Sequence, residues 1–255
     1  MLELNYKTFG QGFPIVILHG LFGTLDNWQT IARRLSEQNM IFLIDQRNHG
    51  RSPHTVDIDY PRMAEDLRQF LESQWIFKAH IIGHSMGGKT AMRFALDHAD
   101  MVEKLMVVDI APKAYTGGHE SIFDALMNLD LGTVETRQDA YDYLKTRIPE
   151  EGTVQFLMKN LSRTKEGSFE WKMNLPAIYN HYEDILAGVE SNTPFEGATL
   201  FIRGQKSNYI QDSDWPLIQT LFPAARLATV PNAGHWVHAD APDALVQLLL
   251  NELDA

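Results

Sequence analysis

Short runs of consecutive apolar residues recur along the chain, and most of them are followed by a turn and then by a segment with helical spacing. Runs with the length and branched composition of buried strands lie at residues 14–18, 40–44, 79–82, 105–108, 198–202 and 227–230. Apolar positions at helical spacing lie at residues 25–36, 60–74, 87–98, 215–221 and 242–253. Strands that are apolar on both faces and alternate with helices are typical of a parallel sheet covered by helices. The pattern therefore predicts an α/β fold with a doubly wound, mostly parallel sheet.

This alternation of strands and helices is interrupted between about residues 111 and 197. Helical spacing is found there at residues 121–128, 136–147 and 154–161, with no convincing strand between these segments. Turn-forming residues, Pro112 and the pair Gly117-Gly118, stand at the start of the interval. We expect residues 1–111 and 197–255 to form the core and residues 112–196 to form a helical cap insertion over the strand ends. The alternative is a set of ordinary peripheral helices.

The composition narrows the classes of function. The 255 residues include 22 Lys and Arg against 33 Asp and Glu, a net charge of −11, so nucleic acids and anionic membrane surfaces are not expected as partners. The absence of cysteine excludes disulfides, a thiolate nucleophile and cysteine metal sites. The N-terminal residues lack the pattern of a signal peptide, and no window approaches 18 apolar residues. We therefore expect a cytoplasmic protein without membrane insertion.

The most informative motif is Gly83-His84-Ser85-Met86-Gly87, which follows a predicted strand and opens a predicted helix. In a G-x-S-x-G sequence the serine sits on a sharp turn, and glycines stand where side chains would collide with neighbouring backbone. Such a turn raises the Ser85 hydroxyl above the sheet edge, where ligands of these folds bind. The backbone N–H of Met86 would point at the same space.

The same residues also fit a second motif. Gly83 and Gly88-Lys89-Thr90 match G-x-x-x-x-G-K-[ST], the phosphate-binding loop of nucleoside triphosphatases. The strand at residues 105–109 ends in an aspartate that could hold Mg²⁺. Both motifs require a strand before and a helix after, so local context does not separate them.

The rest of the chain favours a serine hydrolase over a nucleoside triphosphatase. A hydrolase needs a histidine as base, an acid that orients it, and a second N–H for the oxyanion. His235 follows the last predicted strand, and the loop at residues 19–23 can place the N–H of Leu21 opposite that of Met86. A nucleoside triphosphatase needs neither His235 nor the loop at residues 19–23. Its phosphate-binding loop also usually follows the first strand of the fold. His235 and His238 lack the pattern of a zinc site, so no metal or cofactor is expected.

Five motifs in order extend the argument over nearly the whole chain: HGLFG at residues 19–23, DQRNHG at 45–50, GHSMGGK at 83–89, VDIAP at 108–112 and AGHWVH at 233–238. With these motifs the chain resembles the α/β-hydrolase-fold serine esterases, and the YbfF-type bacterial esterases in particular. The resemblance implies the α/β-hydrolase fold and an acyl-enzyme mechanism. Asn48 stands where a glycine is more usual in the second motif.

The acid of the triad is less clearly marked. In this fold it usually follows the strand at residues 198–202, where this chain offers Ser207 instead. Asp109 ends the preceding strand at the same sheet edge and is the preferred candidate, whereas Asp212 and Asp214 stand where helix caps are common. The resemblance also implies that the triad acid is Asp109, the aspartate of the DIAP segment, and that Ser207 is an auxiliary hydrogen-bonding residue.

These observations predict a serine hydrolase that cleaves small to medium acyl esters through an acyl-enzyme on Ser85. The partner would be a small-molecule ester, and acyl-CoA thioesters present the same carbonyl. C–C bond hydrolases of the same fold and a nucleoside triphosphatase are the alternatives. The sequence pattern does not specify an oligomeric state.

Overall fold

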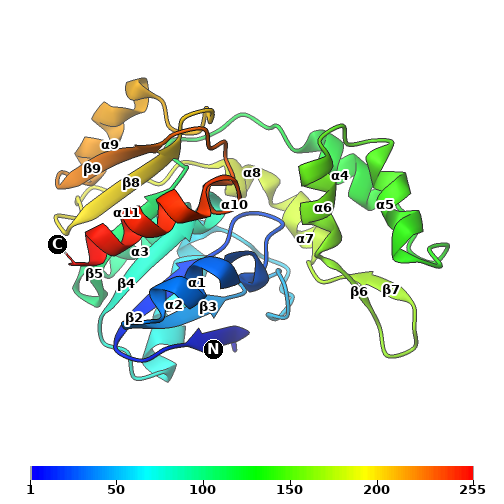
Figure 1. Cartoon of the computed structure of the whole chain (residues 1–255), viewed down its shortest axis with the longest axis horizontal. Helices are drawn as coiled ribbons and strands as arrows, with labels where there is room; N and C mark the ends of the chain where they lie inside the picture. Colours follow the sequence, from blue (N-terminus) through cyan, green and yellow to red (C-terminus); the bar gives the residue numbers. More distant parts are fainter. Residues whose placement is uncertain (1, 255) are drawn as a thin grey trace.

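The computed structural model of the chain describes residues 2–254 and contains a central seven-stranded sheet (Figure 1). Its strands are β1 (Tyr6–Phe9), β2 (Phe13–Leu18), β3 (Asn39–Ile44), β4 (Ala79–His84), β5 (Val102–Val108), β8 (Thr199–Gly204) and β9 (Ala225–Val230). They are ordered β1-β3-β2-β4-β5-β8-β9, and only β1 runs antiparallel to its neighbour. The predicted mostly parallel sheet is confirmed, and the edge strand β1 is the one strand of this sheet that the pattern did not indicate.

Helices cover both faces of the sheet. One face packs against α1 (Gln29–Leu35), which follows the short 3-10 helix η1 (Leu25–Trp28), and against α10 (Val237–Asp240) and α11 (Pro242–Asp254). The other face packs against α2 (Tyr60–Ser73), α3 (Met86–Asp97) and α9 (Trp215–Leu221). Two further 3-10 helices are η2 (Ala99–Met101) and η3 (Asp212–Asp214). None of the helices in the described part of the chain has the length and hydropathy needed to cross a bilayer.

Burial on both faces explains why the strands read as uninterrupted apolar runs. Within β2, Ile15 and Ile17 join the cluster under α1 and α11, whereas Val16 and Leu18 join the cluster under α2 and α3. All four side chains are at most 1% exposed. Successive side chains of a strand point to opposite faces, so a strand between two helical layers needs an apolar residue at every position.

The segment between β5 and β8 is not purely helical, and this corrects the prediction. It contains α4 (Glu120–Met127), α5 (Arg137–Lys145), α6 (Glu151–Met158), α7 (Leu175–Asn180) and α8 (Tyr182–Leu186), but also an antiparallel hairpin of β6 (Leu161–Arg163) and β7 (Phe169–Trp171). Strands of three residues are too short for a period of two to be recognised. Figure 1 shows α4, α5, α6 and the hairpin to one side of the main sheet.

A separate apolar cluster joins this segment to the sheet. Side chains from α4 to α8 pack with Phe22, which follows β2, and with Met86, which opens α3. The amide of the buried Asn160 also donates a hydrogen bond of 2.6 Å to the Phe22 carbonyl. The segment is therefore anchored at the carboxyl ends of β2 and β4.

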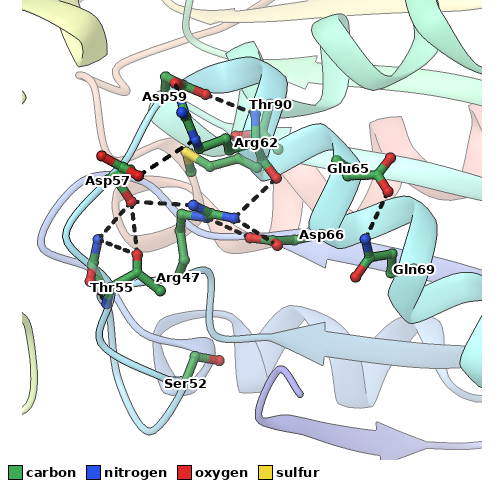
Figure 2. A network of polar contacts seen from close by, with 12 residues as sticks. Arg47, Ser52, Thr55, Asp57, Asp59, Arg62, Glu65, Asp66, Gln69 and Thr90 are labelled. Carbon is green, nitrogen blue, oxygen red and sulfur yellow. Dashed lines mark hydrogen bonds and ion pairs between the residues drawn. The ribbon is translucent and has the colours of Figure 1, made fainter. Parts of the chain in front are cut away.

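A buried ion pair holds the loop after β3 against α2 (Figure 2). The Arg47 guanidinium donates to both carboxylate oxygens of Asp66, at 2.6 and 2.8 Å. Its remaining N–H groups reach the carbonyls of Asp57 and Arg62, at 3.2 and 3.5 Å. Two-pronged pairing of this kind fixes both direction and distance. The loop at residues 45–50, which lies beside the 19–23 loop, is thereby fixed in place.

Asn48 has a defined structural role in this loop. Its backbone adopts a φ of 62°, a left-handed conformation that Asn tolerates better than most residues. Its side-chain oxygen accepts hydrogen bonds from the Thr55 N–H and from the Asn174 amide, at 2.7 and 3.1 Å. The Asn174 N–H donates to the Asn48 carbonyl at 2.8 Å. A glycine at position 48 could adopt the backbone conformation but would lose the side-chain contacts to the 112–196 segment.

We expect Asp66→Asn to lower the free energy of unfolding by about 3–5 kcal/mol, because it leaves the buried Arg47 charge without its partner. Glu65→Gln on the same helix is the matched control. Glu65 pairs with Arg68 in a partly exposed position on the helix surface, so the loss of this pair should cost at most about 1 kcal/mol. Urea unfolding of the three proteins measures the difference. Equal losses in the two variants would contradict the proposed importance of the buried pair.

Candidate active site

The order of the strands creates a crevice at one edge of the sheet. The chain runs from β2 outward to β3 and then returns to β4 on the other side of β2. The loops that leave the carboxyl ends of β2 and β4 therefore diverge, and such a switch point is where open α/β sheets bind ligands. Leu21 follows β2 and Ser85 follows β4, so two of the predicted site residues flank this crevice.

Ser85 lies on a strained turn between β4 and α3. Its φ and ψ are 53° and −120°, a conformation that non-glycine residues rarely adopt. The turn requires glycine on both sides: a Cβ on Gly83 would collide with the Gly87 carbonyl, and one on Gly87 would lie 2.5 Å from the carbonyl oxygens of Leu18 and His19. The strain is maintained by this close packing, as is common at functional sites.

Ser85, His235 and Asp109 form a continuous chain of hydrogen bonds. The Ser85 hydroxyl lies 3.0 Å from His235 Nε2, and His235 Nδ1 lies 2.7 Å from Asp109 Oδ2. A carboxylate can only accept, so the imidazole proton is on Nδ1 and Nε2 is free to accept from the serine. The three residues come from the ends of β4, β9 and β5, which are far apart in sequence and converge at one edge.

The Asp109 carboxylate is fully buried and is held by three donors. Besides His235, it accepts from the Gly204 N–H at 2.9 Å and from the Ser207 hydroxyl. Its backbone φ of 54° places a second strained residue in the site. The two other carboxylates considered from the sequence lie elsewhere. Asp212 pairs with Arg203 at 2.6 Å, and Asp214 pairs with Lys113 at 2.8 Å.

The two N–H groups expected to face an oxyanion belong to Leu21 and Met86. Met86 is the first residue of α3, so its N–H has no acceptor within the helix. In the loop after β2, the neighbouring Phe22 N–H donates to His49 Nε2 at 3.3 Å. Gly20 packs directly on the serine turn, where a Cβ would lie 3.1 Å from Ser85 Cβ. The loop that carries Leu21 is thus in contact with the serine.

Three further histidines lie around the site; His19 and His84 are buried, and His238 is partly buried. His84 Nε2 lies 2.8 Å from the His235 carbonyl, and His19 bonds to the Gly20 carbonyl at 2.8 Å and to the Gln46 N–H at 3.1 Å. Burial lowers the pKa of His84 well below its usual value and lowers the pKa of His19 to about 4. Burial also lowers the pKa of His238 to about 4. The His19 and His84 rings hold neighbouring backbone groups through these hydrogen bonds, and the His238 ring stacks on Trp28.

Sequence reasoning missed Tyr209. Its ring stacks on the His235 imidazole with centroids 3.8 Å apart and planes 17° apart. Its position is fixed by hydrogen bonds of its backbone, one from its N–H to Ser207 Oγ at 3.2 Å and one from the Tyr115 hydroxyl to its carbonyl at 2.5 Å. An aromatic face beside an imidazole stabilises the ring when it becomes positively charged. The only signal in the sequence is that Tyr209 stands two residues after Ser207.

Lys89, which completes the apparent phosphate-binding motif, points away from the loop. Its side chain is buried, and its amine donates to the carbonyls of Leu186 and Ala187, at 3.1 and 2.5 Å. The amine also lies 4.8 Å from the centre of the Tyr115 ring. Burial lowers the pKa of this amine to about 7. Lys89 therefore connects α3 to the end of α8 instead of facing an open phosphate loop.

Two cavities meet at Ser85. The larger, of about 470 Å³, is also lined by His235 and by residues of α4 and α6. The smaller, of about 210 Å³, is also lined by Met86 and by apolar side chains of α8. Four residues line both cavities: Leu21, Ser85, His119 and Tyr209. The serine hydroxyl is thus accessible from two compartments of different character.

Comparisons with known proteins agree with this architecture. A family model described as "alpha/beta hydrolase fold" matches residues 14–242. The esterase YbfF of Escherichia coli is 39% identical over 242 residues, which cover 94% of this chain and 93% of that protein. The sn-1-specific diacylglycerol lipase ABHD11 of Danio rerio is 41% identical over 252 residues, which cover 94% of this chain and 79% of that protein.

A solved structure of a marine microorganism esterase matches with a TM-score of 0.97 and 43% sequence identity, covering 98% of this chain and 99% of that one. The family match spans most of the chain, and the relatives cover it nearly end to end. The chain therefore belongs to the α/β-hydrolase fold family.

Proposed function

We propose that this protein hydrolyses small to medium acyl esters through an acyl-enzyme formed on Ser85. The chain is a carboxylic ester hydrolase; the proposal concerns its residues and its substrates. The observation that carries it is the unbroken path from the Ser85 hydroxyl through His235 to the buried Asp109 carboxylate. A hydroxyl in this setting can transfer its proton as it attacks a carbonyl.

Each member of the path has a distinct role. His235 Nε2 takes the proton from the Ser85 hydroxyl as the oxygen attacks the acyl carbonyl. Asp109 holds the Nδ1 proton in place and stabilises the imidazolium that forms. The N–H groups of Leu21 and Met86 would receive the oxyanion, in agreement with their positions on either side of the serine turn.

The alcohol leaves first, and water then hydrolyses the acyl-enzyme. The imidazolium of His235 gives its proton to the leaving alcohol, the acyl–oxygen bond breaks, and the alcohol departs. Neutral His235 next takes a proton from a water molecule as the water oxygen attacks the acyl-serine. When this intermediate collapses, the bond between the acyl carbon and Ser85 Oγ breaks, His235 returns the proton to Ser85 Oγ, and the carboxylic acid leaves. Ser207 would act as a positioning residue, because its hydroxyl donates to the Asp109 carboxylate and accepts from the Tyr209 N–H, and bonds to neither Ser85 nor His235.

We also propose that residues 112–196 form a cap domain over a core of residues 1–111 and 197–255. Support comes from Ile122 of α4 and from Phe156 and Leu157 of α6, which line the larger cavity at Ser85. A cap in this place would exclude water from part of the site and select the substrate.

Acyl-CoA thioesters and C–C bonds remain open to the same serine chemistry, because both place an electrophilic carbonyl at the hydroxyl. The nucleoside triphosphatase alternative lacks this support, since Lys89 is bonded to the carbonyls of Leu186 and Ala187. We propose oxygen esters, because the larger cavity is lined by the carboxylates of Glu150 and Asp240, which disfavour the polyanionic leaving group of an acyl-CoA thioester.

Replacing the nucleophile should abolish hydrolysis. We expect Ser85→Ala to lower kcat for p-nitrophenyl esters at least about 10⁴-fold, without added metal or nucleotide, because no other group forms the acyl-enzyme. Ser213→Ala, on the exposed surface, is the matched control and should retain full activity. A series from acetate to palmitate in the wild type would measure the accepted acyl length. Undiminished hydrolysis by Ser85→Ala would refute the assignment.

The acid can be identified by comparing three variants. Asp109→Asn should reduce kcat by on the order of 10⁴-fold, because an amide at this position favours the wrong imidazole tautomer. Ser207→Ala should cost about tenfold in kcat with little change in KM, since it removes one of three donors to the carboxylate. Asp212→Asn should have no effect. A large loss in Asp212→Asn with an active Asp109→Asn would reverse the assignment.

A further inference from the structure

The two cavities at Ser85 differ in which end of an ester they can receive. The leaving alcohol must take its proton from His235 Nε2, so it must lie on the side of the serine that His235 occupies. His235 lines the larger cavity, whereas it is not among the residues that line the smaller one. The larger cavity is therefore the compartment of the leaving group.

The smaller cavity suits the acyl chain. Met86, whose N–H would bind the carbonyl oxygen, lines this cavity and not the larger one. Its wall includes the apolar side chains of Ile110, Ile185 and Leu186. A volume of about 210 Å³ also fits a small or medium acyl chain better than a long one. This assignment leaves the larger cavity, whose wall includes residues of α6 and of the loop after β9, to select the alcohol.

The charges around the leaving-group cavity have one sign. Glu150 and Asp240 line it, and none of the described residues that line it is Lys or Arg. The histidines in its wall other than His235 do not offset these carboxylates, since burial lowers the pKa of His119 as well as those of His19, His84 and His238. Lys159, which is not among the lining residues, contributes to the lowered pKa of His238.

Aromatic side chains add to this character. Phe156 of α6 and Trp236, which follows His235, pack with ring centroids 5.3 Å apart and both line the cavity. Glu150 directly precedes α6, and its side chain is exposed. Aromatic faces next to carboxylates favour apolar or cationic groups and disfavour anionic ones.

We propose that the leaving-group cavity selects uncharged or cationic alcohols and rejects polyanionic leaving groups, so that oxygen esters of such alcohols, and not acyl-CoA thioesters, are the substrates. This inference rests on the proposed function, because it concerns the alcohol released in the Ser85 reaction. The phosphates of a coenzyme A leaving group would have to approach the Glu150 and Asp240 carboxylates on a chain of net charge −11.

The ionic-strength dependence of kcat/KM tests the proposal with one acyl group throughout. The probes are butyrylcholine, with a cationic leaving group, glycerol monobutyrate, with a neutral one, and butyryl-CoA. Raising NaCl from about 0.02 to 0.5 M screens charges at the cavity mouth. We expect kcat/KM to fall about threefold to tenfold for butyrylcholine, to stay constant for the glycerol ester, and to rise from a low value for butyryl-CoA.

A charge reversal at one position supplies the second measurement. Glu150→Lys should lower the butyrylcholine to butyryl-CoA ratio of kcat/KM at low salt by at least about tenfold, and Glu150→Gln should lower it by less. Glu166→Lys is the matched control, because Glu166 makes the same change of charge in the exposed β6–β7 turn and does not line the cavity. It should leave the ratio within about twofold of the wild type.

The outcomes separate this inference from the proposed function. Butyryl-CoA hydrolysed as efficiently as the glycerol ester at low salt, with kcat/KM falling as salt rises, would overturn the selectivity while leaving the Ser85 chemistry intact. A ratio that Glu150→Lys and Glu166→Lys change equally would also overturn it. If no ester were hydrolysed by a Ser85-dependent route, the proposed function itself would fail.

Discussion

The site depends on one buried charge, the Asp109 carboxylate. It has no solvent contact, and its stability requires the three donors supplied by His235, Gly204 and Ser207. These donors lie on β8 and on the loops after β8 and β9. Their hydrogen bonds to the carboxylate hold these two loops against the end of β5. The hydrogen bond from His235 Nδ1 to this carboxylate orients the imidazole, so that Nε2 faces the Ser85 hydroxyl.

The 112–196 segment is connected to the same centre through backbone atoms. Asn160 holds the Phe22 carbonyl, and His49 accepts from the Phe22 N–H. Phe22 itself has a φ of 56°, so the turn that follows Leu21 is fixed from both sides. A change in how the segment packs would therefore be transmitted to the loop opposite the serine, and through α6 to the leaving-group cavity. Under the proposed function, substrate selection and the geometry of the reaction would share these contacts.

Much of this arrangement could be predicted from the sequence because its causes are local. Burial on both faces produces uninterrupted apolar strands. The strained turn at Ser85 needs glycines on both sides, and Asp109 ends a strand at the ligand-binding edge of the sheet. Other features depend on tertiary contacts that leave little trace in the sequence. The β6–β7 hairpin has strands of three residues, Tyr209 reaches His235 only through the path of its loop, and Asn48 gains its role from Asn174.

The central claim is that Ser85 is the nucleophile and His235 its base, and covalent trapping tests it most directly. The protein would be treated with a p-nitrophenyl alkylphosphonate, and the adduct located by mass spectrometry of its peptides. The account predicts one adduct, on Ser85, that forms in step with the loss of esterase activity and is strongly slowed in His235→Ala. An adduct on another residue, or full activity in protein completely labelled at Ser85, would contradict it.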